Sequence, residues 1–526
     1  MFDYLKQNAL FTALQDYRLS DLRGDLLSGV TVGIVAVPLA MALAIASGVP
    51  PQYGLYTAIV AGLIIALTGG SRFSISGPTA AFVVILLPIT HQYGLGGLLL
   101  TTVMAGIILI IMGVARMGQL IQFIPYPVTI GFTAGIAVVI ASLQIKDFLG
   151  LTTGELPQHF LEKMSVLLQS LPTTSWSDLF IGLLTLLILI FWSRLKSRIP
   201  GHLVALLIGT LAAWLLTQIW PSFTVATINS QFSFVLDGVT REGIPNAPPL
   251  PLLPWNLQDA SGKPIGLTWQ LIRELLPSAF TVAMLGAIES LLCAVVADGL
   301  TGTRHKPNTE LIGQGIGNLI APFFGSIPAT AAIARTATNI RAGGRSPVAA
   351  VIHSLVILVI VISLAGLLGY LPMASLAALL LVVAWNMSEA RHFVHILRIA
   401  PRCDIVVLLT CFSLTVIFDM VIAVSAGLVL ASILFIRRIS MLTGTELVNL
   451  KEHEHLGDLP EQVAVYDING ALFFGAAEKA ISALHHANSN VEIVVLDMSD
   501  VPMIDMTGIV ALESLLNNLH QQKIAV

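Results

Sequence analysis

Long apolar runs separated by short polar turns make up most of this chain. Each run is close to the length that an α-helix needs to cross about 30 Å of hydrocarbon. Two further segments, 75–89 and 328–340, are shorter and richer in small and polar residues. With these two we expect fourteen membrane segments. The other twelve are 26–47, 54–69, 97–115, 123–143, 177–193, 202–220, 276–297, 309–325, 347–369, 372–388, 403–418 and 420–436.

The positions of the positive charges test this count. Cytoplasmic loops are rich in Lys and Arg, and outer loops are poor in them. The outer loops that fourteen segments imply, such as "GVPPQY", "HQYGLGG" and "GYLP", contain neither residue, whereas the inner loops contain Arg72, Arg116, Arg304 and Arg391 among others. Omitting one short segment would place every later loop on the opposite side of the membrane. The charge pattern therefore predicts an all-α polytopic membrane domain with a cytoplasmic N-terminus.

The composition agrees with this fold class. The 526 residues are 56% hydrophobic and 11% charged, with a mean hydropathy of +0.86, whereas soluble proteins have about 25% charged residues. The net charge of −4 and the lack of a basic run argue against a nucleic-acid partner. The three cysteines lack metal-type spacing, and no phosphate-binding P-loop motif occurs. We expect no metal, no cofactor and no enzymatic reaction.

The pattern changes after the last apolar run and divides the chain into four parts. Residues 1–24 are a non-cleaved cytoplasmic segment, 25–438 the membrane domain, 439–462 a polar linker and 463–526 a small soluble domain. In the last part, short β-branched runs alternate with helical patterns, which is typical of βαβ units. Its final run, "KIAV", is short, so we expect this domain to be incomplete at the C-terminus.

In the soluble domain, the stretch "DMTG" holds two candidate residues. Asp505 and Thr507 most simply cap the helix that follows. Phosphorylation of Thr507, or binding of a cytoplasmic protein there, is the alternative.

Two stretches of the membrane domain resemble each other. "GGSRFSISGPTAAFVV" (69–84) and "FGSIPATAAIARTATN" (324–339) occupy the third and tenth segments, the same place in each set of seven. Such interrupted segments in matching positions of an inverted repeat indicate a transporter binding site. The repeats are about 25–221 and 275–438. Half-helices that begin at Thr79 and near Ala331 would direct two N-terminal ends at the membrane midplane, where they can bind an anion.

Two ionisable side chains lie at membrane depth. Burying Arg335 costs about 3 kcal/mol or more, so it needs a cavity, an anionic ligand or a permanent contact with Glu289 or with backbone carbonyls. Glu289 lies about thirteen residues into its span, on the order of 20 Å deep. It is a candidate to take up and release protons, or else a permanently protonated packing residue. For His353 we expect an interhelical hydrogen bond.

Several motifs in order resemble the SulP (sulfate permease) family of anion transporters: "SGVPPQYGLY", "GGSRFSISGPTAAF", "VVADGLTGTRHKPNTELIGQGIGN" and "VLDMSDVPMIDMTG". The membrane stretches are most similar to the DauA-like branch, which is associated with C4-dicarboxylates. The resemblance implies a UraA-like fold with a seven-plus-seven inverted repeat, core and gate domains, a cytoplasmic STAS domain and a homodimer.

The resemblance also implies where the substrate binds. The family's site lies between the two half-helices, here around Thr79, Ala80, Ala332, Ile333 and Arg335. Related sodium-coupled bicarbonate carriers have Asp at the place of Glu289 and a hydroxyl residue at the place of Cys293. That difference favours protons over sodium as the coupling ion.

These observations predict a secondary active transporter in a bacterial inner membrane with both termini in the cytoplasm. The expected reaction is proton-coupled uptake of C4-dicarboxylates (succinate, fumarate, aspartate) by an elevator-like mechanism, with Glu289 as the proton-coupling residue. The alternatives are a sulfate or bicarbonate transporter coupled to protons or sodium, and an anion channel. A membrane-embedded enzyme fits least, because no catalytic acid–base set clusters at one interface.

Overall fold

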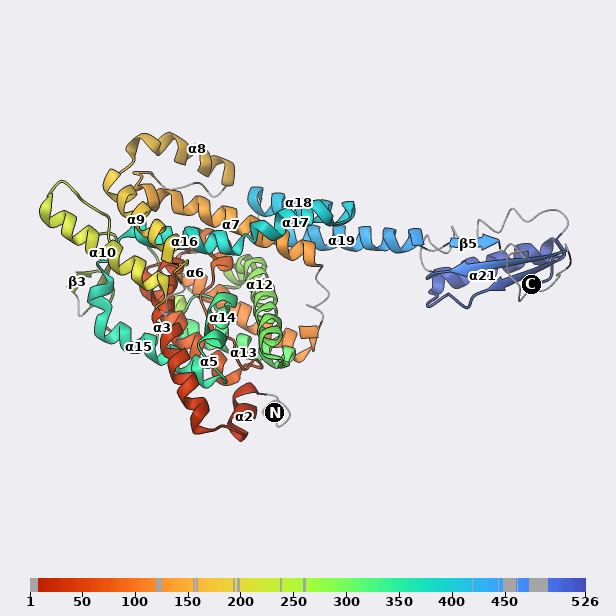
Figure 1. Ribbon diagram of the computed structural model, residues 1–526, viewed down its shortest axis with the longest axis horizontal. Coiled ribbons are helices and arrows are strands. Elements are labelled where there is room, and N and C mark those ends of the chain that lie inside the picture. The colour runs from red at the N-terminus through yellow and green to blue at the C-terminus, as the bar shows by residue number, and fades with distance from the viewer. Residues whose placement is uncertain are drawn as a thin grey trace. The chain divides into compact units, whose positions relative to one another are not determined.

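The computed structural model divides into two compact units, Met1–Gly427 and Leu428–Val526, which are described separately (Figure 1). The described residues are 8–119, 125–154, 157, 159–192, 194–195, 199–236, 239–258, 262–418, 420–442, 444–447, 460, 462–472 and 491–526.

The first unit is almost entirely helical. Its first half contains α2 (Ala9–Gln15), α3 (Leu19–Ala46), α4 (Pro51–Tyr56), a π-helical turn η1 (Thr57–Ala61), α5 (Gly62–Thr68), α6 (Ala80–Val114), α7 (Tyr126–Leu149), α8 (Phe160–Ser170), α9 (Trp176–Trp192) and α10 (Gly201–Ile219). Its second half contains α12 (Trp269–Thr301), α13 (Pro307–Ile320), α14 (Ile333–Arg341), α15 (Val348–Leu368), α16 (Met373–Met387), α17 (Ala390–Ile399) and α18 (Arg402–Ile417). α19 (Met420–Leu442) crosses the boundary between the units. A short helix α11 (Ile228–Gln231) and a hairpin, β2 (Ser233–Leu236) with β3 (Val239–Glu242), join the halves.

Each of the fourteen predicted segments coincides with a helix or part of one. Within the described residues, nine helices are long and apolar enough to cross a membrane, and α8 with α9 forms a further pair bent by 111°. The third and fourth predicted segments are both in α6, which is interrupted at Gly94 (φ 66°, ψ −171°). That backbone conformation is accessible to glycine and breaks the helix. The segments α13, α14 and α18 are shorter than a full span.

The helices pack in two groups. α3, α5, α6, α12, α13, α14 and α15 contact one another, with α3 on α15 and α6 on α12 and α13. α7, α9, α10, α16 and α18 form the second group, with α7 on α16 and α18. Each group combines helices from both halves of the chain, as the predicted core and gate require.

Small residues allow close packing of α3 on α15 in the first group. Gly29 and Gly33 lie one turn apart on α3, and a Cβ at either would collide with α15, against Ile352 and Val356 respectively. Spacing of this kind lets two membrane helices approach at backbone distance. The core group is thereby held together across the two repeats.

Hydrogen bonds to a buried carboxylate hold the N-terminal end of the core group. Asp25 accepts bonds from the backbone N–H groups of Arg345 (2.6 Å) and Ser346 (3.1 Å), and from the hydroxyls of Ser346 (2.5 Å) and Tyr17 (2.9 Å). Burial, followed by the contact with Asp25, raises the pKa of Tyr17 to about 12. The Tyr17 phenol therefore remains a donor at physiological pH, and this contact anchors α3 to the start of α15.

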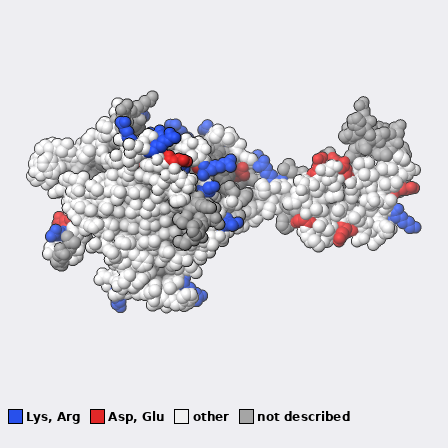
Figure 2. All heavy atoms as spheres, turned by 90° about the horizontal axis from the view of Figure 1, so that it is seen from below, with Lys and Arg blue, Asp and Glu red and all other residues white. Residues whose placement is uncertain are grey.

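The surface of the first unit agrees with a membrane environment. Figure 2 shows a broad face made mostly of uncharged residues. Large apolar side chains are exposed along α9 and α10, among them Phe180, Leu187, Leu207 and Trp214. Exposed apolar residues of this density are expected where helices face lipid.

The second unit contains a three-stranded sheet in the order β5-β6-β7, from β5 (Gly444–Leu447), β6 (Val463–Asn469) and β7 (Ile493–Asp497). β5 pairs antiparallel with β6, and β6 pairs parallel with β7. β5 lies in the range predicted as linker. The final predicted run adds a parallel bridge between Ile493 and Ala525.

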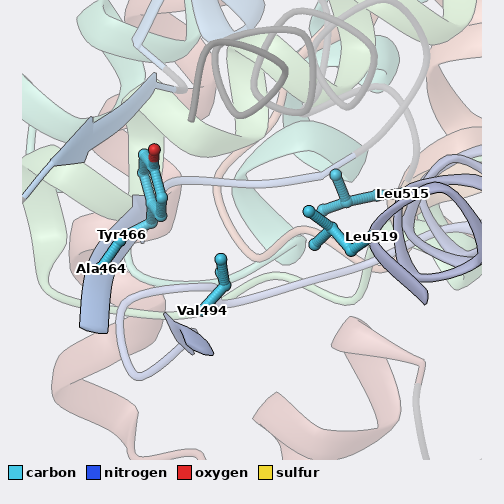
Figure 3. Close-up of a cluster of buried hydrophobic side chains, with 5 residues drawn as sticks. All are labelled: Ala464, Tyr466, Val494, Leu515 and Leu519. Carbon is cyan, nitrogen blue, oxygen red and sulfur yellow. The ribbon is translucent and has the colours of Figure 1, made fainter. Parts of the chain in front are cut away.

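One helix of the second unit covers the sheet. α21 (Met506–Gln521) supplies Leu515 and Leu519 to a core with Ala464, Tyr466 and Val494 (Figure 3). Asp505 caps α21, as predicted, by accepting a hydrogen bond from the Gly508 N–H at 2.8 Å. The parallel strand pair and this helix are the α/β arrangement expected from the sequence.

Candidate functional site

Two extended segments meet inside the core group and start two helices. β1 (Ser76–Gly77) pairs antiparallel with β4 (Thr330–Ala331), with Ser76 opposite Ala331. β1 leads into α6 through Thr79, and β4 leads into α14 through Ala332. The predicted helix starts are therefore correct at Thr79 and one residue early at Ala331. Because the strands run in opposite directions, the N-terminal ends of both helices converge.

Each helix end offers backbone N–H groups to a ligand. The first turn of an α-helix has no intrahelical acceptors for these groups, and neither Thr79 nor Ala332 caps its helix with a side chain. Ala80, at 9% exposure, and Ala332 leave room for close approach, whereas Ile333 is 45% exposed. The two ends therefore carry partial positive charge where they converge, with small side chains at Ala80 and Ala332.

Arg335 is buried in the first turn of α14, with 3% of its surface exposed. Its Nη2 donates to the carbonyl of Pro78 at 2.7 Å, and a Cβ at Gly77 would lie against its Nη1. Among the described residues, no group accepts from its Nε or Nη1. The described side chains also give it no ion pair with Glu289. Of the predicted contacts, the one with a carbonyl is formed, and two N–H-bearing atoms remain for an anion or water.

Glu289 lies on α12 and faces the start of α6. Its Oε2 accepts a hydrogen bond from the Thr79 hydroxyl at 2.8 Å, and the residue is half-buried. Thr79 and Pro78 are adjacent, so the acid and the guanidinium contact consecutive residues of one loop. A change in the protonation of Glu289 can therefore alter the position of the residues that hold Arg335.

A buried carboxylate that sequence reasoning missed holds the segment before β1. Glu310, 1% exposed, accepts bonds from the backbone N–H groups of Gly70 (2.9 Å) and Ser71 (3.0 Å), and from Ser290 and Gln314 (3.0 Å each). Gln314 also donates to the Ser76 hydroxyl at 3.1 Å. The spacing of Glu310 and Gln314 by four residues, within a segment predicted to cross the membrane, was the available signal.

A second set of hydrogen bonds fixes the strand pair against α12 and α14. The Thr336 hydroxyl accepts from the Ile75 N–H at 3.0 Å and from the Cys293 thiol at 3.1 Å. The Thr330 hydroxyl donates to the Gly286 carbonyl at 2.9 Å. Cys293 therefore occupies a structural position one turn from Glu289.

Two other predicted residues lie outside this arrangement. His353 is fully buried on α15, and neither ring nitrogen has a partner among the residues that the structure describes, contrary to the expected interhelical hydrogen bond. Buried polar groups of this kind commonly bind water. Thr507 is exposed in the first turn of α21, in the second unit.

Comparison with known proteins identifies the family. Residues 22–411 match the Sulfate permease family, and residues 458–526 match the STAS domain. The chain belongs to the sulfate permease family. This family consists of transporters, so the protein is a multi-pass membrane transporter of anions and not an enzyme.

Two relatives of this chain have names that state a substrate. It is 40% identical over 514 residues to the "Putative sulfate transporter YvdB" of Bacillus subtilis, covering 97% of this chain and 92% of the relative. It is 30% identical over 521 residues to the bicarbonate transporter BicA of Picosynechococcus, covering 94% and 86%. Both relatives are named as transporters of sulfate or bicarbonate, and these names do not support the predicted DauA-like branch.

Solved structures confirm the fold. The transmembrane domain of a cyanobacterial bicarbonate transporter BicA matches with a TM-score of 0.64 and 28% identity, covering 79% of this chain and 98% of that one. Murine Slc26a9 in the inward-facing state matches with a TM-score of 0.84 and 19% identity, covering 99% and 87%. The chain thus has a helical polytopic SLC26-like membrane domain and a small α/β STAS domain.

Proposed function

We propose that this protein is a proton-coupled transporter of a compact inorganic oxyanion, sulfate or bicarbonate. The observation that carries this proposal is the convergence of two helix N-termini beside a buried guanidinium with two atoms free to donate. Such a group can bind two oxygens of one anion. Thr79, Ala80, Ala332, Ile333 and Arg335 would surround the anion.

A C4-dicarboxylate fits this site less well. Its second carboxylate would need another cationic or donor group, and Arg335 is the one basic side chain that the described residues place at the two helix ends. The names of the relatives also favour a single compact oxyanion. Transport of sulfate or bicarbonate, the alternative considered from the sequence, is therefore better supported than transport of a C4-dicarboxylate.

Glu289 would couple the movement of protons to the transport of the anion. Its hydrogen bond to Thr79 joins the ionisable group to the loop that starts α6. Protonation would remove a negative charge close to the anion, and release would restore it. The core group would then move against the gate group as a unit, in a homodimer in a bacterial inner membrane with both termini in the cytoplasm. The STAS domain would bind a cytoplasmic partner, with Thr507 as the regulatory position.

Uptake into proteoliposomes tests this proposal. The purified full chain is assayed with radiolabelled sulfate, bicarbonate and succinate under an inward proton gradient or an inward sodium gradient. We expect saturable uptake of sulfate or bicarbonate that requires the proton gradient. Uptake of succinate alone would support the prediction of a C4-dicarboxylate transporter. An anion current that is not coupled to protons and does not saturate would indicate a channel.

Substitution of Arg335 ties the activity to the site. Arg335→Gln removes the positive charge and is expected to lower uptake at least about tenfold, the loss of one charged hydrogen bond. Arg341→Gln is the matched control, because Arg341 is exposed in the last turn of the same helix. Equal uptake by the two variants would exclude Arg335 from the site.

A further inference from the structure

A second polar region lies between the core and gate groups. A cavity of about 920 Å³ is lined by the ends of α3 and α7, the part of α6 before Gly94, α8, and the starts of α12 and α16. Under the topology predicted from the charges, all of these ends are on the outer side of the membrane. We call this cavity the outer vestibule.

A lysine from α8 is buried in the wall of the outer vestibule. Lys163 is 5% exposed, and the described part of the chain provides no hydrogen-bond or ion-pair partner for its ammonium group. Because Lys163 lines the cavity and no described residue pairs with its ammonium group, its charge is available to an anion that enters the vestibule.

Other donors line the same vestibule. Lys146 lies in the last turn of α7. The hydroxyl oxygen of Thr153 is buried, and no described residue bonds to it. Asp147, His91 and Tyr93 are the other titratable side chains in the wall. Two ammonium groups thus face one carboxylate, so the charge of the wall favours an anion over a cation.

We propose that the outer vestibule contains a second anion site, built on Lys163 with Lys146 and Thr153, which captures a compact oxyanion from outside. The captured anion then passes to the two helix ends. This inference rests on the proposed transport of oxyanions, and it adds a separate place of first contact. A cluster of positive charge in a cleft raises the local concentration of anions and accelerates their association.

The kinetics of uptake test the capture site. In zwitterionic lipid, so that no anionic headgroup can supply the ligand, Lys163→Gln is expected to raise the KM for external oxyanion about tenfold, with little change in the maximal rate. Lys163→Arg should restore the KM. Arg273→Gln is the matched control, since Arg273 is exposed near the start of α12 and does not line the vestibule.

The dependence on salt separates capture from a structural effect. Attraction by an accessible charge weakens as ionic strength rises, so the KM of the wild type should increase with an inert salt and that of Lys163→Gln, which retains only Lys146, should increase less. If Lys163→Gln and Arg273→Gln have the same KM and the same salt dependence, the proposed capture site is refuted, but the proposed transport function is not. No uptake by the wild type would refute the proposed function instead.

A measurement on the unaltered protein complements these variants. An amine-acylating reagent is applied with and without sulfate or bicarbonate, and modified lysines are quantified by peptide mass spectrometry. The oxyanion should slow the modification of Lys163 and leave that of exposed Lys263 unchanged. Equal rates at Lys163 with and without oxyanion would overturn the proposal. Protection that appears only in vesicles containing anionic lipid, without added oxyanion, would also overturn it and assign the site to a headgroup.

Discussion

Arg335 and Glu289 lie on different helices, and each contacts the loop that begins α6 rather than the other. The guanidinium binds the Pro78 carbonyl, and the carboxyl group accepts from Thr79. An ion pair between them would neutralise the positive charge needed for an anion. Separate contacts to adjacent residues keep that charge available and still connect the two groups through one peptide unit.

Replacing Glu289 by Gln tests the role of its proton. The amide retains an acceptor for the Thr79 hydroxyl, so the site should keep its geometry and lose the titratable group. We expect uptake driven by a proton gradient to fall about tenfold or more, as for a functional ionisable group at membrane depth, and substrate-dependent proton flux to disappear. Uptake and pH change are recorded in the same proteoliposomes.

A charge at the other end of the same helix provides the control for this experiment. Glu274 is exposed in the first part of α12, and Glu274→Gln should leave both signals at the wild-type level. Proton flux that persists in Glu289→Gln at the control level would assign coupling to another group.

At the scale of elements, the site depends on the positions at which membrane helices are interrupted. β1 and β4 leave α6 and α14 without a preceding turn, and Gly94 separates the half-helix from the rest of α6. The buried Glu310 occupies the place of a missing helical turn by accepting from the backbone of Gly70 and Ser71. Interrupted helices in a membrane need such substitutes for backbone hydrogen bonds.

Gly77→Ala should disrupt this arrangement. The added Cβ would press on Nη1 of Arg335, and overpacking of this kind costs about 1–3 kcal/mol. We therefore expect lower thermal stability and a loss of oxyanion uptake. Both are measured on detergent-purified and reconstituted protein.

Gly366→Ala is the matched substitution, because a Cβ there meets no atom within 4 Å and the residue is in the last turn of α15. It should be neutral or stabilising by up to about 1 kcal/mol. If the two alanine variants behave alike, close contact at Gly77 does not position Arg335.

Sequence reasoning predicted these elements unevenly. Each segment predicted from the apolar runs overlaps a helix of the described chain, and the helix starts predicted from the short Gly- and Pro-containing stretches lie within one residue of the N-cap residues Thr79 and Ala332. Those signals are local, since they follow from the cost of burying bare backbone and charge.

Partners of individual side chains were predicted less well. The Pro78 carbonyl is 257 residues away from Arg335, and Glu310 meets Gly70 across 240 residues. Composition carries no information about which of many polar groups meets another after folding. The break at Gly94, in contrast, lies between the third and fourth expected segments, 75–89 and 97–115, as the sequence predicted.

At the scale of the whole molecule, the transport site and the STAS domain are in different units. Every residue of the candidate site lies between Thr79 and Arg335, within Met1–Gly427, whereas Thr507 lies within Leu428–Val526. The second unit has its own hydrophobic core, formed by α21 and the sheet. Its contribution to transport is therefore expected to be regulatory.

Truncation after Leu442 tests this division. The shortened protein retains the membrane unit and should transport oxyanion at a rate within about twofold of the full chain, because units with separate cores can function separately. Uptake is normalised to the amount of monodisperse protein. A properly inserted truncated protein that fails to transport would show that the STAS domain is needed for the transport cycle.

The pairing of β1 with β4 has a further consequence for energetics. Because the two helix starts are bonded to each other, they cannot separate to admit the anion from one side and release it on the other. For one protonation state of Glu289, the part of the site formed by the two helix starts is therefore expected to be the same in every orientation of the core. A difference in apparent affinity between the two membrane faces is then expected to arise from the protonation of Glu289 or along the access paths.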